Sequence, residues 1–192
     1  MGDEVEVSRV VARAKAGDSQ AFDELYDRYA GRVYRYALAR VAEPADAEDL
    51  LQRVFLKVIE ALPRYEDRGV PFGAWLFRIA RNAVVDQGRV PQPTTTLDAA
   101  LGHVDGAHGP DRLAELAADR AVVRAALSEL TPEQREVVLY RFFAGLSPRE
   151  IGLLMGKREG TIRALQFRAL ATLRRKLGAE ELPFGLVMEE GS

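Results

Sequence analysis

The sequence predicts an all-α protein made of two small helical domains that are joined by a flexible linker. Apolar residues recur every three or four positions along most of the chain, the spacing that places them on one face of a helix. No segment of the sequence shows a comparable alternation of apolar and polar residues, so strands are not expected. The helical pattern fails over residues 91–112, and this break separates the two domains.

The first domain is expected over residues 8–90 as a helical bundle. Asp18 can cap a helix that begins at Ser19, and residues 44–49 open another helix with acids in its first turn. The apolar residues at helical spacing in these two helices are Phe22, Leu25, Tyr26, Tyr29, Val33, Leu51, Val54, Phe55, Val58, Ile59 and Leu62.

Two interruptions of the helical pattern follow. The first is residues 64–68, between Pro63 and Gly69, after which a helix is expected from about residue 71 to 87. The second is the linker at 91–112, where prolines, glycines and three consecutive threonines replace the apolar residues. Both interruptions are expected to lack regular structure.

The second domain is expected over residues 113–178, followed by an acidic C-terminal tail at 179–192. Residues 131–134 (TPEQ) and 147–150 (SPRE) each offer a hydroxyl N-cap, a proline at the first helical position and a Gln or Glu at the third. These two capping boxes predict two helix starts.

The segment from residue 147 to 175 has the organisation of a helix-turn-helix motif: a short helix, a turn at Gly156 and a longer basic helix from about Glu159. Four residues are expected to pack inward on the longer helix: Ile162, Leu165, Ala169 and Leu173. Its other side carries Arg158, Arg163, Ala164, Phe167 and Arg168. This second set suits a DNA major groove, although the cations could be a solvated face and Phe167 could close the core.

Composition excludes several functional classes. The chain has no cysteine, and its two histidines, His103 and His108, lie in the linker, so we expect no metal and no other cofactor. It also has no phosphate loop and no nucleophile with a general base, which argues against an enzyme. No apolar run approaches the length of a membrane span and the N-terminus is acidic, so we expect a cytoplasmic protein without membrane insertion.

Charge is distributed unevenly along the chain. Residues 131–178 contain 10 Lys or Arg and 4 Asp or Glu, whereas the flanking segments are acidic. If three or four of these cations contact phosphates, the logarithm of the binding constant falls with the logarithm of salt concentration with a slope of only about −3 to −4. Such a slope corresponds to weak binding. No sustained heptad pattern indicates a dimer, so we expect a free monomer that needs another partner for affinity.

The chain resembles the extracytoplasmic-function group of sigma-70-type factors across residues 8–178. Residues 46–56 (DAEDLLQRVFL) and 72–86 (FGAWLFRIARNAVVD) are similar to sigma region two. Residues 130–139 (LTPEQREVVL), 145–151 (GLSPREI) and 160–163 (GTIR) are similar to region four. The resemblance implies a factor that directs core RNA polymerase to promoter DNA and helps to open it.

The resemblance also assigns roles to residues of the first domain. Asp49, Gln52 and Phe55 would dock on the clamp coiled coil of the largest polymerase subunit, although this helix could instead be a core helix with a solvated edge. The loop at 64–69 would capture a flipped base of the minus-ten element, and the next helix would face the same DNA strand. The minus-ten residues implied in this way are Arg64, Tyr65, Arg68, Arg78, Asn82 and Asp86, while Trp75 is expected in the core.

The second domain would, by the same resemblance, bind the flap of the second-largest subunit and read the minus-thirty-five element. The residues implied for this reading are Arg158, Thr161, Arg163, Ala164, Phe167 and Arg168. An anti-sigma factor is an expected further partner. Three departures from the family pattern affect polymerase contact and base preference: Arg53, Arg158 and the run Leu165-Gln-Phe167.

Two alternatives remain open on the sequence alone. The linker could thread through the polymerase or serve as a simple tether, which at about 20–25 flexible residues reaches roughly 25–30 Å. The chain as a whole could be a stand-alone helix-turn-helix regulator whose first domain binds a ligand or partner. Such a regulator would bind duplex DNA without polymerase.

Overall fold

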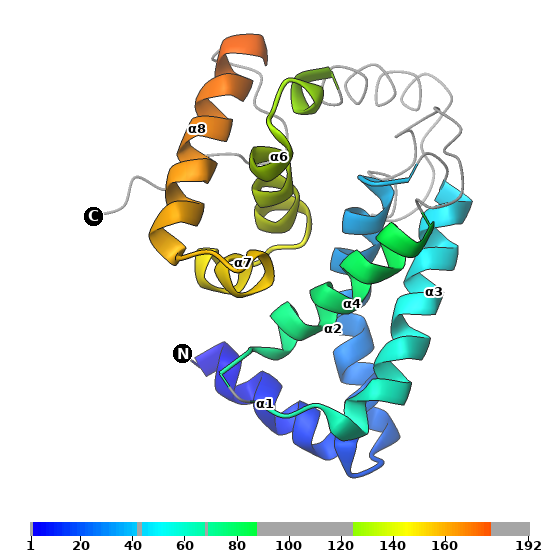
Figure 1. The fold of residues 1–192 in the computed structure, drawn as a ribbon. Helices are drawn as coiled ribbons and strands as arrows, with labels where there is room; N and C mark the ends of the chain where they lie inside the picture. Colours follow the sequence, from blue (N-terminus) through cyan, green and yellow to red (C-terminus); the bar gives the residue numbers. More distant parts are fainter. Residues whose placement is uncertain (1, 42–43, 68, 88–124, 178–192) are drawn as a thin grey trace.

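The computed structural model describes residues 2–41, 44–67, 69–87 and 125–177 of the 192-residue chain. All regular structure in these residues is helical, which confirms the all-α prediction (Figure 1). The predicted linker, the acidic tail and both histidines lie outside the described residues.

The first part of the chain forms a bundle that we call the N-terminal unit. Helix α2 packs against both α1 and α3, and α4 packs against α3 on the other side. The elements of this unit are α1 (Gly2–Lys15), α2 (Ser19–Leu38), α3 (Pro44–Ala61), the 3₁₀ turn η1 (Leu62–Arg64) and α4 (Phe72–Gln87).

Local sequence signals set the starts of these helices as predicted. The Asp18 side chain accepts a hydrogen bond of 3.2 Å from the backbone N–H of Ala21, so it caps α2. Helix α3 begins at Pro44, where φ is already suitable for a helix. Helix α4 begins at Phe72, one residue after the expected position.

Two of the apolar residues at helical spacing in α2 and α3 are exposed. The side chains of Tyr26 and Ile59 are 41% and 51% exposed, whereas the other core candidates of the same two helices are buried or partly buried. Each follows a buried residue, Leu25 and Val58 respectively. One helical position is a rotation of about 100°, which is enough to move an apolar side chain from the core edge to the surface.

The last part of the described chain forms a second bundle that we call the C-terminal unit. Helix α8 packs against both α6 and α7. The elements of this unit are α6 (Pro132–Val138), the π-helical turn η2 (Leu139–Phe143), α7 (Pro148–Met155) and α8 (Glu159–Leu177).

Both predicted capping boxes are present. Thr131 and Gln134 exchange hydrogen bonds of 3.3 and 3.1 Å, and Ser147 and Glu150 exchange bonds of 3.2 and 2.8 Å. Gly156 ends α7 in the left-handed conformation, with φ of 64°, as its position in the turn predicted. The helix-turn-helix geometry of α7 and α8 is therefore built from local signals.

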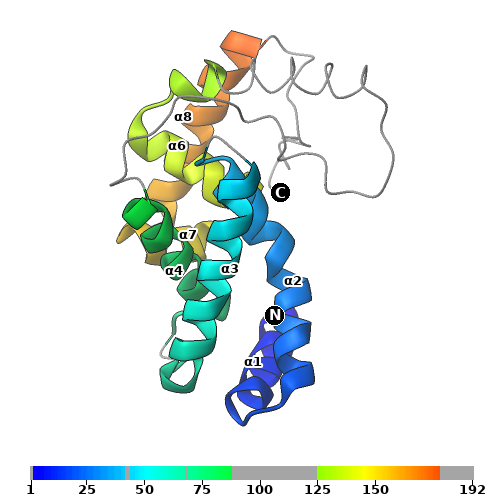
Figure 2. The same ribbon diagram turned by 90° about the vertical axis from the view of Figure 1, so that its right-hand side faces the viewer.

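The two units are packed against each other, which the sequence did not predict. Helix α4 lies against α7, and α2 lies against η2 (Figures 1 and 2). Their buried side chains form one continuous apolar cluster. The described arrangement is thus a closed one, in which the two units share an interface.

Two aromatic rings meet at the centre of this interface. Tyr36 of α2 and Tyr140 of η2 stack with ring centroids 5.3 Å apart and an interplanar angle of 13°, and the Tyr36 hydroxyl donates to the Tyr140 hydroxyl at 3.3 Å. Burial raises the pKa of both hydroxyls, so both stay protonated at neutral pH. The π-helical turn is the element that carries Tyr140 to this position.

An ion pair lies beside the stacked rings. The guanidinium of Arg40 pairs with the Glu136 carboxylate at 2.6 Å and lies over the Tyr36 ring at 4.9 Å. Nε and Nη2 of Arg40 and Oε2 of Glu136 are buried without a hydrogen-bond partner in the part of the chain that the structure describes. A buried polar atom without a hydrogen-bond partner raises the free energy of the closed arrangement, because it could bind water if it were exposed.

A second arginine, eight positions earlier and within α2, joins the units. Arg32 donates from Nε to the Ala144 carbonyl at 2.6 Å and from Nη2 to the Gly145 carbonyl at 3.0 Å, while its guanidinium lies over Tyr29 and Phe77. Gly145 has φ of 64°, and a Cβ there would lie 3.3 Å from Arg32 Nε. Glycine therefore suits both the turn and the approach of the arginine.

Candidate nucleic-acid and polymerase interfaces

The recognition helix α8 presents one apolar and one polar face, as the sequence predicted. The four residues expected inside are buried: Ile162, Leu165, Ala169 and Leu173. The residues expected outside are exposed: Arg158, Thr161, Arg163, Ala164, Phe167 and Arg168. All six candidate minus-thirty-five residues are thus accessible to a large ligand such as DNA.

Phe167 belongs to the exposed face and not to the core. Its side chain is 62% exposed, between the exposed Arg163 and Arg168 on the same helix. A phenyl ring in water is unfavourable, so an exposed one flanked by cations suggests a contact surface. Phe167 therefore does not close the core of the described residues, and its contact with DNA stays a prediction.

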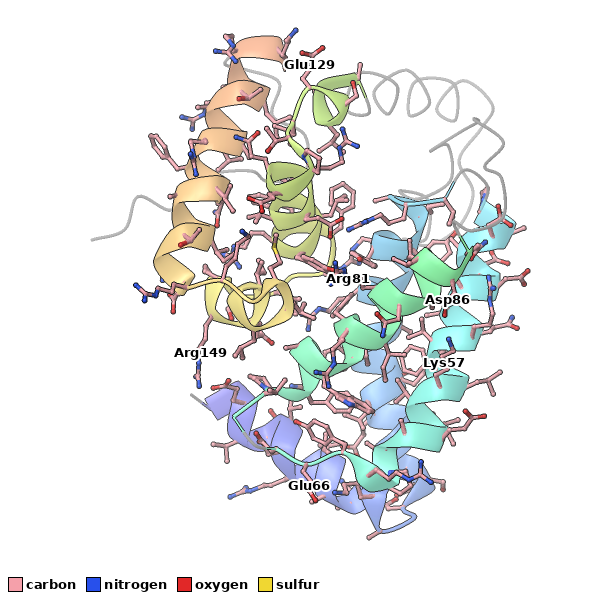
Figure 3. The ribbon with its side chains drawn as sticks, viewed as in Figure 1. Lys57, Glu66, Arg81, Asp86, Glu129 and Arg149 are labelled. Atoms are coloured by element: carbon pink, nitrogen blue, oxygen red, sulfur yellow. The ribbon has the colours of Figure 1, made fainter. Side chains whose placement is uncertain are left out.

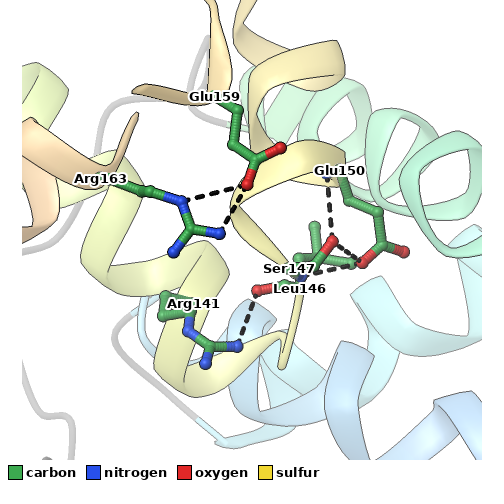
Figure 4. Close-up of polar contacts among 6 residues, drawn as sticks. All are labelled: Arg141, Leu146, Ser147, Glu150, Glu159 and Arg163. Carbon is green, nitrogen blue, oxygen red and sulfur yellow. Dashed lines mark hydrogen bonds and ion pairs between the residues drawn. The ribbon is translucent and has the colours of Figure 1, made fainter. Parts of the chain in front are cut away.

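Arg163 is held by an acid one helical turn earlier. Its Nε and Nη2 atoms lie 3.1 and 2.6 Å from Oε1 of Glu159 (Figure 4). An exposed pair of this kind stabilises a helix by only about 0.3–0.5 kcal/mol. A bidentate contact with guanine is worth about 1–3 kcal/mol, so a base can displace Glu159.

The 64–69 loop of the N-terminal unit has its ends fixed by Tyr65. The Tyr65 side chain is only 6% exposed; its ring contacts Phe72 and Trp75, and its hydroxyl donates to the Val70 carbonyl at 2.9 Å. Tyr65 is therefore a support of this loop in the described state, and its ring is not presented to solvent. Arg64 is exposed, whereas Arg68 lies outside the described residues.

The other candidate minus-ten residues lie on the exposed side of α4. Arg78, Asn82 and Asp86 are each four positions apart and exposed, so they form one stripe along the helix. Asp86 pairs with Lys57 of α3 at 3.5 Å (Figure 3). Trp75 is buried in the core, as the sequence analysis expected.

Helix α3 carries an exposed stripe that mixes polar and apolar residues. Asp49 and Gln52 are exposed, and Leu56 and Ile59 continue the same side with exposed fractions of 59% and 51%. Phe55, the third candidate for polymerase docking, is 5% exposed and packs against Phe22 and Tyr26. Phe55 thus supports the stripe from beneath, and the exposed Leu56 and Ile59 were not among the docking candidates that the sequence suggested.

Arg53, one of the departures from the family pattern, bridges two helices. Its Nη2 donates to Oε1 of Gln87 at 2.6 Å, and its Nε donates to the Asp49 carbonyl at 3.2 Å. In this structure the arginine joins α3 to the end of α4. Arg53 therefore has a structural role here, which is to connect α3 with the last residue of α4.

Two other kinds of site were tested on the described residues. They contain no group of three or more histidine, cysteine or acidic side chains that could hold a metal ion. None of their helices is both long enough and apolar enough to cross a bilayer.

Two family models match the chain, one over each unit. The model of Sigma-70 region 2 matches residues 25–90, and the model of Sigma-70 region 4 matches residues 126–175. The first match contains α3, the loop and α4, and the second contains the whole helix-turn-helix motif.

Three curated relatives are similar over most of the chain. The ECF RNA polymerase sigma factor BldN of Streptomyces coelicolor is 39% identical over 179 residues, covering 91% of this chain and 67% of the relative. The ECF RNA polymerase sigma factor ShbA of Streptomyces griseus is 36% identical over 178 residues, covering 88% of this chain and 93% of the relative. The ECF RNA polymerase sigma factor SigD of Mycobacterium tuberculosis is 37% identical over 180 residues, covering 88% of this chain and 83% of the relative.

Solved structures agree with the fold. CnrH, in a complex with the cytosolic domain of CnrY, is 28% identical with a TM-score of 0.66, covering 90% of this chain and 97% of that one. The sigma factor RpoE of Bartonella quintana, in a complex with the anti-sigma factor NepR, is 23% identical with a TM-score of 0.60, covering 83% and 98%. The second likeness concerns the fold alone.

The different positions of Phe167 and Leu165 on α8 give a stability prediction. Replacing exposed Phe167 with alanine should change the free energy of unfolding by less than about 0.5 kcal/mol. Replacing buried Leu165 with alanine should lower it by about 2–4 kcal/mol, because it leaves a cavity. Urea unfolding followed by circular dichroism measures both values. A loss for Phe167→Ala as large as that for Leu165→Ala would mean that the phenyl ring is part of the core.

Proposed function

The chain belongs to the extracytoplasmic-function group of RNA polymerase sigma factors, and we propose that it binds core polymerase, reads the minus-ten and minus-thirty-five elements and helps to open the promoter. Sigma factors are DNA-binding initiation factors and not enzymes. One observation carries the proposal: a single chain exposes the basic second helix of a helix-turn-helix motif on one unit, and the 64–69 loop beside a polar stripe of α4 on the other. Its targets are core polymerase and chromosomal DNA, so it would act in the cytoplasm.

The minus-thirty-five element would be read by α8. Arg163 can leave Glu159 to meet a guanine, and Phe167 and Ala164 can contact thymine methyl groups. Arg158 and Arg168 would neutralise phosphates, and Thr161 can donate a hydrogen bond to the DNA backbone.

The minus-ten element would be met by the loop and by α4 of the N-terminal unit. The loop would hold a flipped base between its fixed ends, with Arg64 and Arg68 near the backbone, and Arg78, Asn82 and Asp86 would face the same strand. In this proposal Tyr65 acts by holding the loop, since its ring packs in the core.

Core polymerase would bind through the stripe on α3. Asp49 and Gln52 offer polar anchors, while Leu56 and Ile59 offer exposed apolar area to a partner helix such as the clamp coiled coil. The C-terminal unit would meet the flap of the second-largest subunit. Polymerase thereby supplies the affinity that the few cations of α8 lack. An anti-sigma factor is a further proposed partner, since the similar protein CnrH was solved in a complex with the cytosolic domain of CnrY.

Promoter binding requires the two units to separate. Elements centred near positions −35 and −10 lie roughly 85 Å apart along B-DNA, at about 3.4 Å per base pair. In the closed arrangement α4 touches α7, and a compact chain of this length has a radius of gyration of only about 16 Å. We therefore propose that polymerase binding opens the interface formed by Tyr36, Arg40, Glu136 and Tyr140.

The opening can be measured with two spin labels. The chain has no cysteine, so Asp23→Cys on α2 and Leu153→Cys on α7 place one label on an exposed site of each unit. We expect one short distance in the free protein and a distance longer by tens of ångströms with core polymerase and promoter DNA. An unchanged distance in an active initiation complex would contradict the opening. Two labels within α2 and α4 serve as a control, because their distance should stay constant.

Loss of Arg163 should affect promoter reading alone. Arg163→Ala removes a base contact worth about 1–3 kcal/mol, so promoter-specific run-off transcription should fall about 5- to 150-fold while affinity for core polymerase is unchanged. Arg174→Ala, at the far end of the same helix, is the matched control and should have a much smaller effect. A parallel loss of polymerase binding in Arg163→Ala would contradict the assignment of α8 to DNA.

A combined Asp49→Ala and Gln52→Ala change should weaken core binding. Both side chains are exposed, so the free energy of unfolding should stay within about 0.5 kcal/mol of the wild-type value. The affinity for core polymerase, measured by fluorescence anisotropy, should fall about tenfold for the loss of two polar anchors. Unchanged affinity would reject this surface, and DNA binding by the wild type without polymerase would favour a stand-alone regulator.

A further inference from the structure

A lysine from the first helix contacts the base-capture loop. Lys15, the last residue of α1, donates from Nζ to the backbone carbonyl of Tyr65, which lies 50 positions later in the sequence. The segment between α3 and α4 runs along α1, and Glu66 of the loop lies beside that helix (Figures 1 and 3). Lys15 also precedes the segment that region 2 of the family matches, which begins at residue 25.

Tyr65 is fixed on three sides. Lys15 holds its carbonyl, Val70 accepts from its hydroxyl, and its ring lies 5.7 Å from Phe72 and 4.9 Å from Trp75 between ring centroids. Burial raises the pKa of the Tyr65 hydroxyl to about 12, so the hydroxyl remains a donor at physiological pH. The loop backbone is therefore anchored where it leaves η1 and again where it approaches α4.

The lysine is the part of this anchor that carries charge. A carbonyl that accepts from an ammonium forms a stronger hydrogen bond than one that accepts from a neutral group. The ring and the hydroxyl of Tyr65 fix the side chain, but the direction of the peptide between Tyr65 and Glu66 depends on what the carbonyl meets. That peptide leads into the exposed residues Glu66, Asp67 and Gly69 of the loop.

We propose that Lys15 is a positioning residue that sets the conformation of the 64–69 loop and thereby the efficiency and base preference of minus-ten capture. This inference rests on the proposed function of the loop. Lys15 acts through the Tyr65 carbonyl and does not itself touch the flipped base. Without it, the loop samples more conformations and must be ordered at the moment the base enters.

The variants are Lys15→Met, which keeps the aliphatic stem, and Lys15→Arg, which keeps a cationic donor. Arg9→Met removes the same charge from an exposed site of the same helix and is the matched control. Hydrogen exchange of the free protein reports the loop directly. We expect amide protection at 65–70 to fall about tenfold in Lys15→Met, the effect of one charge-assisted hydrogen bond, with little change in Lys15→Arg or Arg9→Met. Trp75 is the only tryptophan of the chain, so its emission reports the same packing.

The functional measurements separate this inference from the proposed function. For Lys15→Met with core polymerase, we expect unchanged core affinity, promoter opening slowed about tenfold and a weaker preference at the captured base in a minus-ten library. If Lys15 instead binds a phosphate, the slope of promoter binding against salt concentration falls by about one in Lys15→Met. Base preference at the captured position and amide protection of the loop in the free protein then stay as in the wild type. This result overturns the inference. Equal opening by Lys15→Met and wild type also overturns it. Failure of the wild type to bind core polymerase would reject the proposed function itself.

Discussion

The contact between Tyr36 and Tyr140 determines how the two units are arranged. The stacked rings, the Arg40–Glu136 pair and the two Arg32 hydrogen bonds join α2 to the C-terminal unit and bring α4 against α7. This interface combines apolar burial with polar atoms that have no partner among the described residues. Apolar burial favours closure and the unpaired polar atoms oppose it, so a binding partner that contacts the separated units better than the closed ones would shift the arrangement toward the open one.

The parts of the fold that the sequence predicted are those fixed by neighbouring residues. Asp18, Thr131 and Ser147 cap helices through bonds to backbone groups three positions away, and Gly156 ends a helix through its own φ angle. The inward and outward faces of α8 followed from the same local periodicity. These features depend on short stretches of sequence, which is why periodicity and capping rules were sufficient.

The parts that the sequence did not predict depend on residues far apart in the chain. Tyr36 and Tyr140 are separated by 104 positions, and nothing in either local pattern indicates that the rings stack. Tyr65 looked like a base-stacking residue because it lies in a polar loop, but Phe72 and Trp75 bury its ring. Phe55 was expected at a docking surface, but Phe22 and Tyr26 of α2 cover its ring, and these neighbours lie about 30 positions earlier in the chain.

The two elements proposed to read the promoter are held by contacts inside their own units. Lys15, Tyr65 and Val70 hold the loop within the N-terminal unit, and Glu159 pairs with Arg163 within the C-terminal unit. None of these bonds crosses the interface at Tyr36 and Tyr140. Separation of the units would therefore break the shared interface and leave both reading elements preformed. A factor built in this way can change the distance between its reading elements on polymerase without having to refold either of them.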